Sequence, residues 1–246
     1  MRCKMKSKSL LIVLLLILII LSFTACEHST DFEEDGIKYR EFDGATSVLG
    51  FVDEENSTKD LVIKGKTNQF PQYYVWAIGF YAFENSDVET VTIEYYKAPY
   101  NVFHTDSSEM LCTFEKILDK AFKNCKQLRE ITFPKEMTTI CVESFWGCES
   151  LKEVTFPWGL QKIEQSAFAQ CSNLSVVHFD ENFNFLGANA FVNCAQQMTL
   201  YMKCPPPTVD GEAFSWGTQI TVVVPQQLFE VYSNHEYWGK FNIVVE

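Results

Sequence analysis

The feature that most constrains this 246-residue chain is a 23-residue repeat. Six pairs of alanine or serine followed by phenylalanine recur between residues 82 and 214, and the successive intervals between their phenylalanines are 39, 23, 23, 23 and 23 residues. A unit this short cannot bury its own apolar side chains, so neighbouring units must stack into a solenoid around one core. The six positions are Phe83, Phe122, Phe145, Phe168, Phe191 and Phe214.

Other positions keep the same step and predict the shape of each unit. An aliphatic residue stands five positions before every repeat phenylalanine, and a cysteine stands three positions after four of them. Short runs such as Ile131–Thr132–Phe133 alternate apolar and polar residues, which is typical of a strand with one buried face. Proline follows two of these runs and ends the strand. We therefore expect one short parallel strand per unit, then a turn and a compact coil or short helical turn that inserts the phenylalanine.

The repeat resembles the leucine-rich repeat of BspA-like bacterial surface proteins over about residues 75–224. The resemblance implies a leucine-rich repeat solenoid of about six 23-residue repeats, with an adhesive function. The matching pattern is Leu160-x-x-Ile163-x-x-x-Ala167-Phe168-x-x-Cys171-x-x-Leu174-x-x-Val177.

The N-terminal segment, residues 1–25, is predicted to be a lipoprotein signal peptide. Basic residues precede a run of twelve apolar residues from Leu10 to Leu21, which is shorter than the roughly 20 that a membrane-spanning helix needs. The following Thr24–Ala25–Cys26 resembles a bacterial lipobox, which implies lipidation of Cys26; a plain secretory peptide is the alternative. Residues 26–35 are acidic, and they resemble the tether that sends some lipoproteins to the outer face of the outer membrane. A solvated linker and a periplasmic location remain open.

The remaining domains follow from the repeat. Residues 36–75 are predicted to form an N-terminal cap, residues 76–224 the solenoid, and residues 225–246 a C-terminal cap. The first interval exceeds the repeat by 16 residues, which places an insertion at about residues 95–112. This insertion is either a binding loop or a surface loop that the fold tolerates without a role in binding.

Outward positions of successive strands are the candidate ligand-binding residues. Their side chains would repeat along one extended surface, which suits a long partner. The alternative is that threonine stands there because β-branched residues favour strands. The candidates are Thr132, Thr155, His178 and Tyr201, flanked by Glu130 and Glu153, with Thr92 in the same row.

No motif points to a catalytic site, a cofactor or a metal. The four histidines are far apart in sequence, and nucleophile, phosphate-loop and dinucleotide-binding patterns are missing. Repeat cysteines fall in phase with the predicted core, where a free thiol behaves as a small apolar group. Pairing among Cys112, Cys141 and Cys204 stays open. A net charge of −12 argues against a nucleic-acid partner, because little would neutralise phosphates.

Two classes of function fit this sequence. The favoured one is a non-enzymatic, lipid-anchored protein that binds a protein ligand, either a host matrix protein or a bacterial surface protein. The alternative is a carbohydrate-binding accessory of a glycan-uptake system, because Trp146, Trp158 and Trp216 fall in or near turns. An enzyme with a site built from the insertion and the caps is the least favoured reading.

Overall fold

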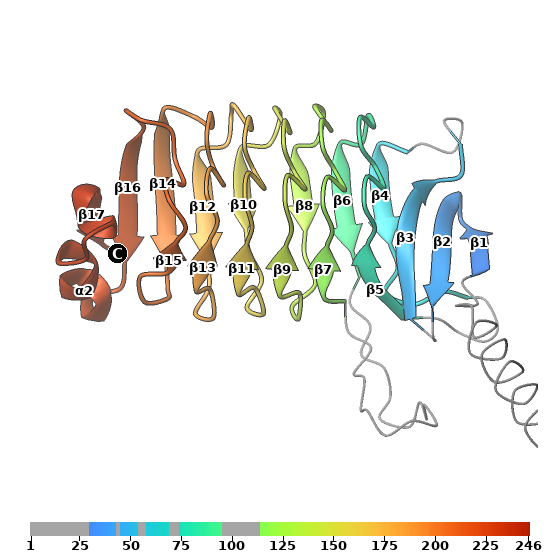
Figure 1. Ribbon diagram of the computed structural model, residues 1–246, viewed down its shortest axis with the longest axis horizontal. Coiled ribbons are helices and arrows are strands. Elements are labelled where there is room, and N and C mark those ends of the chain that lie inside the picture. The colour runs from blue at the N-terminus through green and yellow to red at the C-terminus, as the bar shows by residue number, and fades with distance from the viewer. Residues whose placement is uncertain (1–29, 43–44, 54–57, 69–73, 95–113) are drawn as a thin grey trace, which may run out of the picture.

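The computed structural model describes residues 30–42, 45–53, 58–68, 74–94 and 114–246 (Figure 1). The predicted signal peptide, Cys26, Cys112 and the predicted insertion at 95–112 lie outside these ranges. Among the described residues, no helix is long and apolar enough to cross a membrane.

The chain coils into one elongated stack in which each turn of the coil contributes two strands, one to each side of the core (Figure 1). In the described part, one side is a single sheet with the order β1-β2-β3-β5-β7-β9-β11-β13-β15. Its strands are β1 (Thr30–Glu34), β2 (Ile37–Phe42), β3 (Ala45–Phe51), β5 (Tyr74–Ile78), β7 (Lys116–Ile117), β9 (Thr139–Ile140), β11 (Lys162–Ile163), β13 (Phe185–Leu186) and β15 (Thr208–Val209).

The other side, which we call the long-strand face, carries two sheets in the described residues, with the orders β4-β6-β8 and β10-β12-β14-β16-β17. All neighbouring strands within these two sheets are parallel. Their bounds are β4 (Asp60–Ile63), β6 (Thr90–Ile93), β8 (Glu130–Thr132), β10 (Glu153–Thr155), β12 (Val176–Phe179), β14 (Gln197–Met202), β16 (Gln219–Val224) and β17 (Asn242–Val245).

The repeat phenylalanines form one continuous file through the core, as the spacing predicts. All six are buried, and the rings of each consecutive pair stack nearly parallel with centroids 5.0 to 5.8 Å apart. Phe83 and Phe122 stack like the others although 39 residues separate them, so the longer interval leaves the register of the core unchanged. The fold is therefore the predicted leucine-rich repeat solenoid.

The turn around each phenylalanine has a backbone conformation that the sequence did not reveal. Residues two before and two after the phenylalanine have positive φ in successive repeats, for example Glu143 at 54° and Gly147 at 76° around Phe145. The left-handed region disfavours most side chains, so this geometry needs compensation. Backbone bonds between units supply it: the amide of each of the first five phenylalanines donates to the carbonyl of the small residue in the next unit, at 2.7 to 2.9 Å.

Repeat cysteines are free thiols, as predicted, and they also connect neighbouring units. Each thiol donates a hydrogen bond to the backbone carbonyl of a repeat phenylalanine in the preceding unit, at 3.0 to 3.3 Å. Cys125, Cys148 and Cys171 are fully buried, and Cys194 is half-buried. Cys141 and Cys204, whose pairing the sequence left open, are free thiols as well.

The N-terminal end begins earlier than the sequence indicated. Residues 30–34 were assigned to the acidic tether, but they form β1, which pairs antiparallel with β2. Asp31 accepts hydrogen bonds from Arg40, and the Phe32 ring stacks on Tyr39, so two local contacts draw this acidic segment into the cap. Within the predicted N-terminal cap, β2 and β4 supply buried aliphatic side chains such as Ile37 and Leu61.

The C-terminal end is closed by helical turns and one last parallel strand. The elements are the 3-10 helix η2 (Gln226–Leu228), helix α2 (Phe229–Ser233), the 3-10 helix η3 (Trp238–Lys240) and β17. Tyr232 and Trp238 are fully buried, and the Trp238 indole donates to the Pro207 carbonyl at 3.0 Å. These aromatic side chains cover the apolar end of the core, which would otherwise face water.

Candidate binding surface

The outward positions of the long-strand face form two parallel rows. One row, which we call the outer row, begins at Val62 in the described residues. Within each of the two sheets, every member pairs in register with the member on the next strand. The sequence-predicted threonines, His178 and Tyr201 all lie in it. Its members are Val62, Thr92, Thr132, Thr155, His178, Tyr201, Val223 and Val244.

Glu130 and Glu153 occupy the second row. Glu130 pairs with Thr90 in the register of β6 and β8, and Glu153 pairs with Val176 in that of β10 and β12. Both carboxylates are exposed. Their strands, β8 and β10, belong to different sheets, so this is where the hydrogen-bonded long-strand face is interrupted.

Three of the predicted residues contact one another on the C-terminal side of that interruption. The His178 Nε2 atom lies 3.1 Å from Glu153 Oε1, and the His178 ring stacks on Tyr201 with centroids 4.4 Å apart. The ring planes differ by only 6°, so the two rings pack face to face. We call Glu153, His178 and Tyr201 the aromatic cluster.

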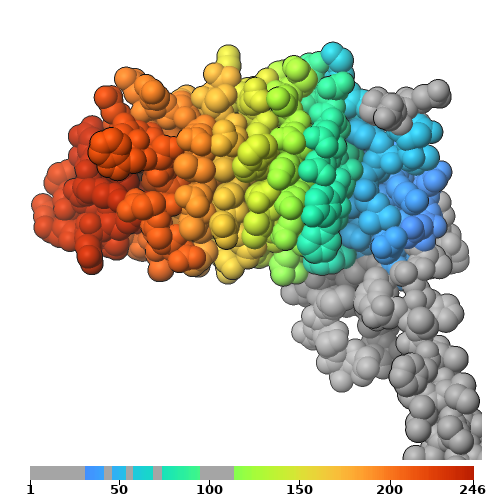
Figure 2. All heavy atoms as spheres, turned by 45° about the horizontal axis from the view of Figure 1, so that its top comes forward, coloured from blue at the N-terminus to red at the C-terminus, as the bar shows by residue number. Residues whose placement is uncertain are grey.

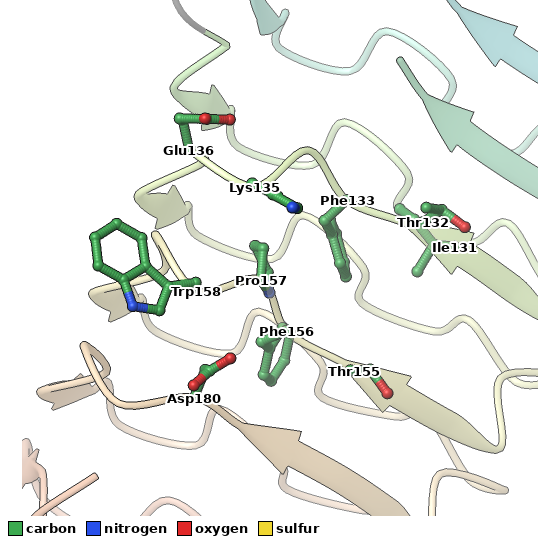
Figure 3. Close-up of a pocket in the computed structure, with 10 residues that line it drawn as sticks. All are labelled: Ile131, Thr132, Phe133, Lys135, Glu136, Thr155, Phe156, Pro157, Trp158 and Asp180. Atoms are coloured by element: carbon green, nitrogen blue, oxygen red, sulfur yellow. The ribbon is translucent and has the colours of Figure 1, made fainter. Parts of the chain in front are cut away.

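Thr132 and Thr155 line a groove instead. It has a volume of about 610 Å³ and lies beyond the carboxyl ends of β8 and β10 (Figure 3). The two threonines stand at one end of it and Trp158, which is 59% exposed, at the other. The residues that line it are Ile131, Thr132, Phe133, Lys135, Glu136, Thr155, Phe156, Pro157, Trp158 and Asp180.

The charged residues of this groove were not predicted. Lys135 and Glu136 follow β8 and Asp180 follows β12, and only the stacking of the units brings them together. Glu136 has a buried Oε2 atom with no hydrogen-bond partner among the described residues. A buried polar atom without a partner destabilises the fold and is uncommon in native proteins.

The tryptophans considered for sugar binding have different surroundings. Trp158 lies at the groove, whereas Trp216 is fully exposed on a turn after β15. Trp146 is half-buried, and the Lys123 ammonium sits 4.9 Å from its ring centroid. Of the three, only Trp158 combines an exposed ring with a hollow surface in the described part of the chain.

Figure 2 shows the stacked units as a continuous surface from the N-terminal to the C-terminal end of the solenoid. A parallel-strand solenoid with capped ends and a regular exposed strand face defines a leucine-rich repeat protein. The family model described as BspA type leucine rich repeat region matches residues 95–221 in six copies. The chain therefore belongs to the BspA-type leucine-rich repeat family. Comparison with curated proteins gives no significant match.

Two solved bacterial structures share the fold, and a third is similar in sequence. The pneumococcal vaccine antigen PcpA is 18% identical with a TM-score of 0.58, and the match covers 81% of this chain and 51% of that one. A leucine-rich cell surface protein from Faecalibacterium prausnitzii is 14% identical with a TM-score of 0.53, covering 88% and 54%. A leucine-rich repeat protein from Bacteroides capillosus is 22% identical with a TM-score of 0.48, covering 60% and 96%. The chain thus spans about half the length of the first two structures.

Proposed function

We propose that this chain is a lipid-anchored, non-enzymatic bacterial surface protein that binds another protein through the C-terminal half of its long-strand face. The observation that carries the proposal is the aromatic cluster, in which the stacked His178–Tyr201 pair lies beside the exposed Glu153 carboxylate. Aromatic side chains with polar neighbours dominate the binding energy of many protein interfaces.

The surroundings of the aromatic cluster extend the same surface. In the outer row, Val223 and Val244 follow Tyr201 in register, so apolar side chains continue toward the C-terminal cap. On the N-terminal side the next three members of the row are exposed threonines, with Glu130 and Glu153 beside them. An apolar patch with a polar, acidic border is typical of a binding site for a folded protein or an extended segment.

A binding screen tests this proposal. The full chain in a nonionic detergent is applied to arrays of host matrix proteins and bacterial surface proteins, and saturable ligands are then measured with variants. We expect Tyr201→Ala to weaken binding at least about tenfold, as for an interface hot spot. Tyr81→Ala is the matched control, because Tyr81 is an exposed tyrosine on a turn away from the long-strand face. Equal affinity of the Tyr201 variant and the wild type would refute the assignment of this face.

The groove supports a second candidate, carbohydrate capture as an accessory to glycan uptake. An exposed indole can stack on a sugar ring while carboxylates and hydroxyls bind its hydroxyl groups. Trp158 supplies the ring, and Glu136 supplies a carboxylate oxygen without a partner in the described residues. Polysaccharide should quench tryptophan fluorescence of the wild type and of Trp216→Ala, but not of Trp158→Ala. Quenching that survives in Trp158→Ala would place any glycan elsewhere.

The anchor is a separate part of the proposal. The lipobox-like Thr24–Ala25–Cys26 supports acylation of Cys26, and two or more acyl chains hold a protein stably on a membrane. Metabolic labelling with a fatty acid should mark the wild type but not Cys26→Ser. Exposure of the labelled protein to external protease in intact cells would distinguish the cell surface from the periplasmic face.

A further inference from the structure

Three metal-ligating side chains from consecutive units meet on the side of the solenoid opposite the long-strand face. Asp119 lies two residues after β7, Cys141 directly follows β9, and Glu164 directly follows β11. One carboxylate oxygen of each acid and the Cys141 sulfur all lie within 4.8 Å of one another. The residues are 22 and 23 positions apart in the sequence, so only the stacking of the units assembles them.

Cys141 differs from the other described thiols. Those of Cys125, Cys148, Cys171 and Cys194 donate to backbone carbonyls, and Cys204 contacts the Tyr232 hydroxyl. Cys141 is 7% exposed; its backbone amide and carbonyl are hydrogen-bonded, but its thiol has no hydrogen-bond partner among the described residues. A buried thiol that faces two carboxylates, and makes no other polar contact there, is poorly explained as packing alone.

The two carboxylates are also available. Asp119 forms no side-chain hydrogen bond or ion pair with the part of the chain that the structure describes. Glu164 pairs through Oε1 with Lys162 Nζ at 2.7 Å, which leaves its second oxygen free. Both acids are half-buried, so small rotations of their side chains can adjust the site while it stays open to water.

We propose that Asp119, Cys141 and Glu164 bind a zinc ion, with water at the fourth position. The donor set favours zinc over calcium or magnesium, because a thiolate binds borderline and soft metals whereas the latter prefer oxygen alone. Tetrahedral zinc holds its ligand atoms roughly 3.5 Å apart, so the group needs only a modest contraction. On binding, the Cys141 S–H bond breaks, its proton passes to solvent, and the sulfur bonds to the metal.

Such a site would join three units that otherwise contact one another only through neighbour-to-neighbour stacking. One ion would connect the residues that follow β7, β9 and β11. Metal binding to the folded state alone raises its stability. The site is independent of the proposed ligand-binding face, so each can fail without the other.

Cobalt titration tests the proposal. The full chain in nonionic detergent, reduced and stripped of metal with a chelator, is titrated with Co²⁺ and the thiolate-to-cobalt charge-transfer absorption is followed. We expect a band that saturates at one ion per chain and disappears when Zn²⁺ is added. Cys141→Ser should remove this band and weaken zinc binding at least about tenfold. Cys194→Ser is the matched control, because it makes the same change at a half-buried repeat thiol and should leave the band intact.

A second pair of variants keeps the test decisive if Cys141→Ser fails to fold. Asp119→Asn leaves every thiol in place and should lower zinc affinity, and zinc should raise the melting temperature of the wild type more than that of this variant. Asp210→Asn is its control, because Asp210 is an exposed aspartate in the corresponding turn after β15. No thiolate band in the wild type, or an unchanged band in Cys141→Ser, would overturn the proposal.

Discussion

Replacing Phe168 by alanine tests the central claim that one file of aromatic rings holds the units together. The Phe168 side chain is fully buried, and its ring stacks on Phe145 at 5.0 Å and on Phe191 at 5.5 Å. Phe156 packs edge-on against it from the long-strand side at 5.6 Å. The substitution therefore removes contacts to both neighbouring units and opens a cavity in the middle of the solenoid.

The expected loss follows from burial and ring contacts. A buried phenylalanine removes about 150–250 Å² from water, and truncation to alanine at about 25 cal/mol per Å² costs about 3 kcal/mol. Each stacked pair adds about 0.5–1.5 kcal/mol. The two stacked pairs bring the sum to about 4–6 kcal/mol. Because neighbouring side chains relax into part of the cavity, we expect the free energy of unfolding to fall by about 3–5 kcal/mol, the usual range for such a core truncation.

Urea unfolding, followed by far-ultraviolet circular dichroism, measures this change. Phe80→Ala is the matched control, since Phe80 is 60% exposed, and its unfolding free energy should change by less than about 0.5 kcal/mol. The urea dependence must be compared as well, because a smaller slope would mean that end units unfold separately. A loss below about 1 kcal/mol for Phe168→Ala, or equal losses for both variants, would refute the aromatic-file argument.

Two further predictions concern the C-terminal cap and the thiols. Trp238→Ala should lower the unfolding free energy by about 3–5 kcal/mol, because it removes a buried side chain from the cap and leaves the Pro207 carbonyl without its hydrogen-bond donor. Trp216 is fully exposed, so Trp216→Ala should be nearly neutral in the same urea assay. Burial raises the pKa of the Cys125 and Cys204 thiols to about 11 from an ordinary value of 9.0. The folded state thus holds these protons more tightly, so stability should be constant below about pH 9 and fall between about pH 9 and 11, by up to about 1.4 kcal/mol per thiol for each pH unit. Urea midpoints at several alkaline pH values check this, with Cys204→Ser expected to show the smaller slope; midpoints that stay level would contradict it.

The repeat determined most of the fold in advance, for a simple physical reason. In a solenoid each unit packs only against its neighbours, so the residues that form the core recur at one fixed spacing. This spacing can be read from the sequence. The phenylalanine file and the buried Ile117, Ile140 and Ile163 follow from the period and are confirmed, and three of the four repeat thiols are buried as predicted, whereas Cys194 is half-buried. The N-terminal boundary was misplaced because β1 lies outside the period and is held by specific contacts, such as that of Arg40 with Asp31.

The candidate site was predictable only where it shares the period. Alternation placed Thr132, Thr155, His178 and Tyr201 at outward positions, and the strand register aligns Thr155, His178 and Tyr201 in one row, with Thr132 aligned to Thr92 in the other sheet. The sequence did not show which of these residues lie together. Thr132 and Thr155 line the groove, whereas His178 and Tyr201 stack on each other. Side-chain conformation and the interruption between β8 and β10 decide this, and neither leaves a mark in the sequence.

By itself, the sequence determined the class of fold, the identity of the core and the direction in which each strand side chain points, because all three follow from a repeated local pattern. Only the tertiary structure decided which side chains outside the repeated pattern lie close together. Asp119, Cys141 and Glu164 look unrelated along the chain, as do Glu136, Trp158 and Asp180. Stacking places consecutive units roughly 4.8 Å apart, so residues more than 20 positions distant become neighbours and form sites.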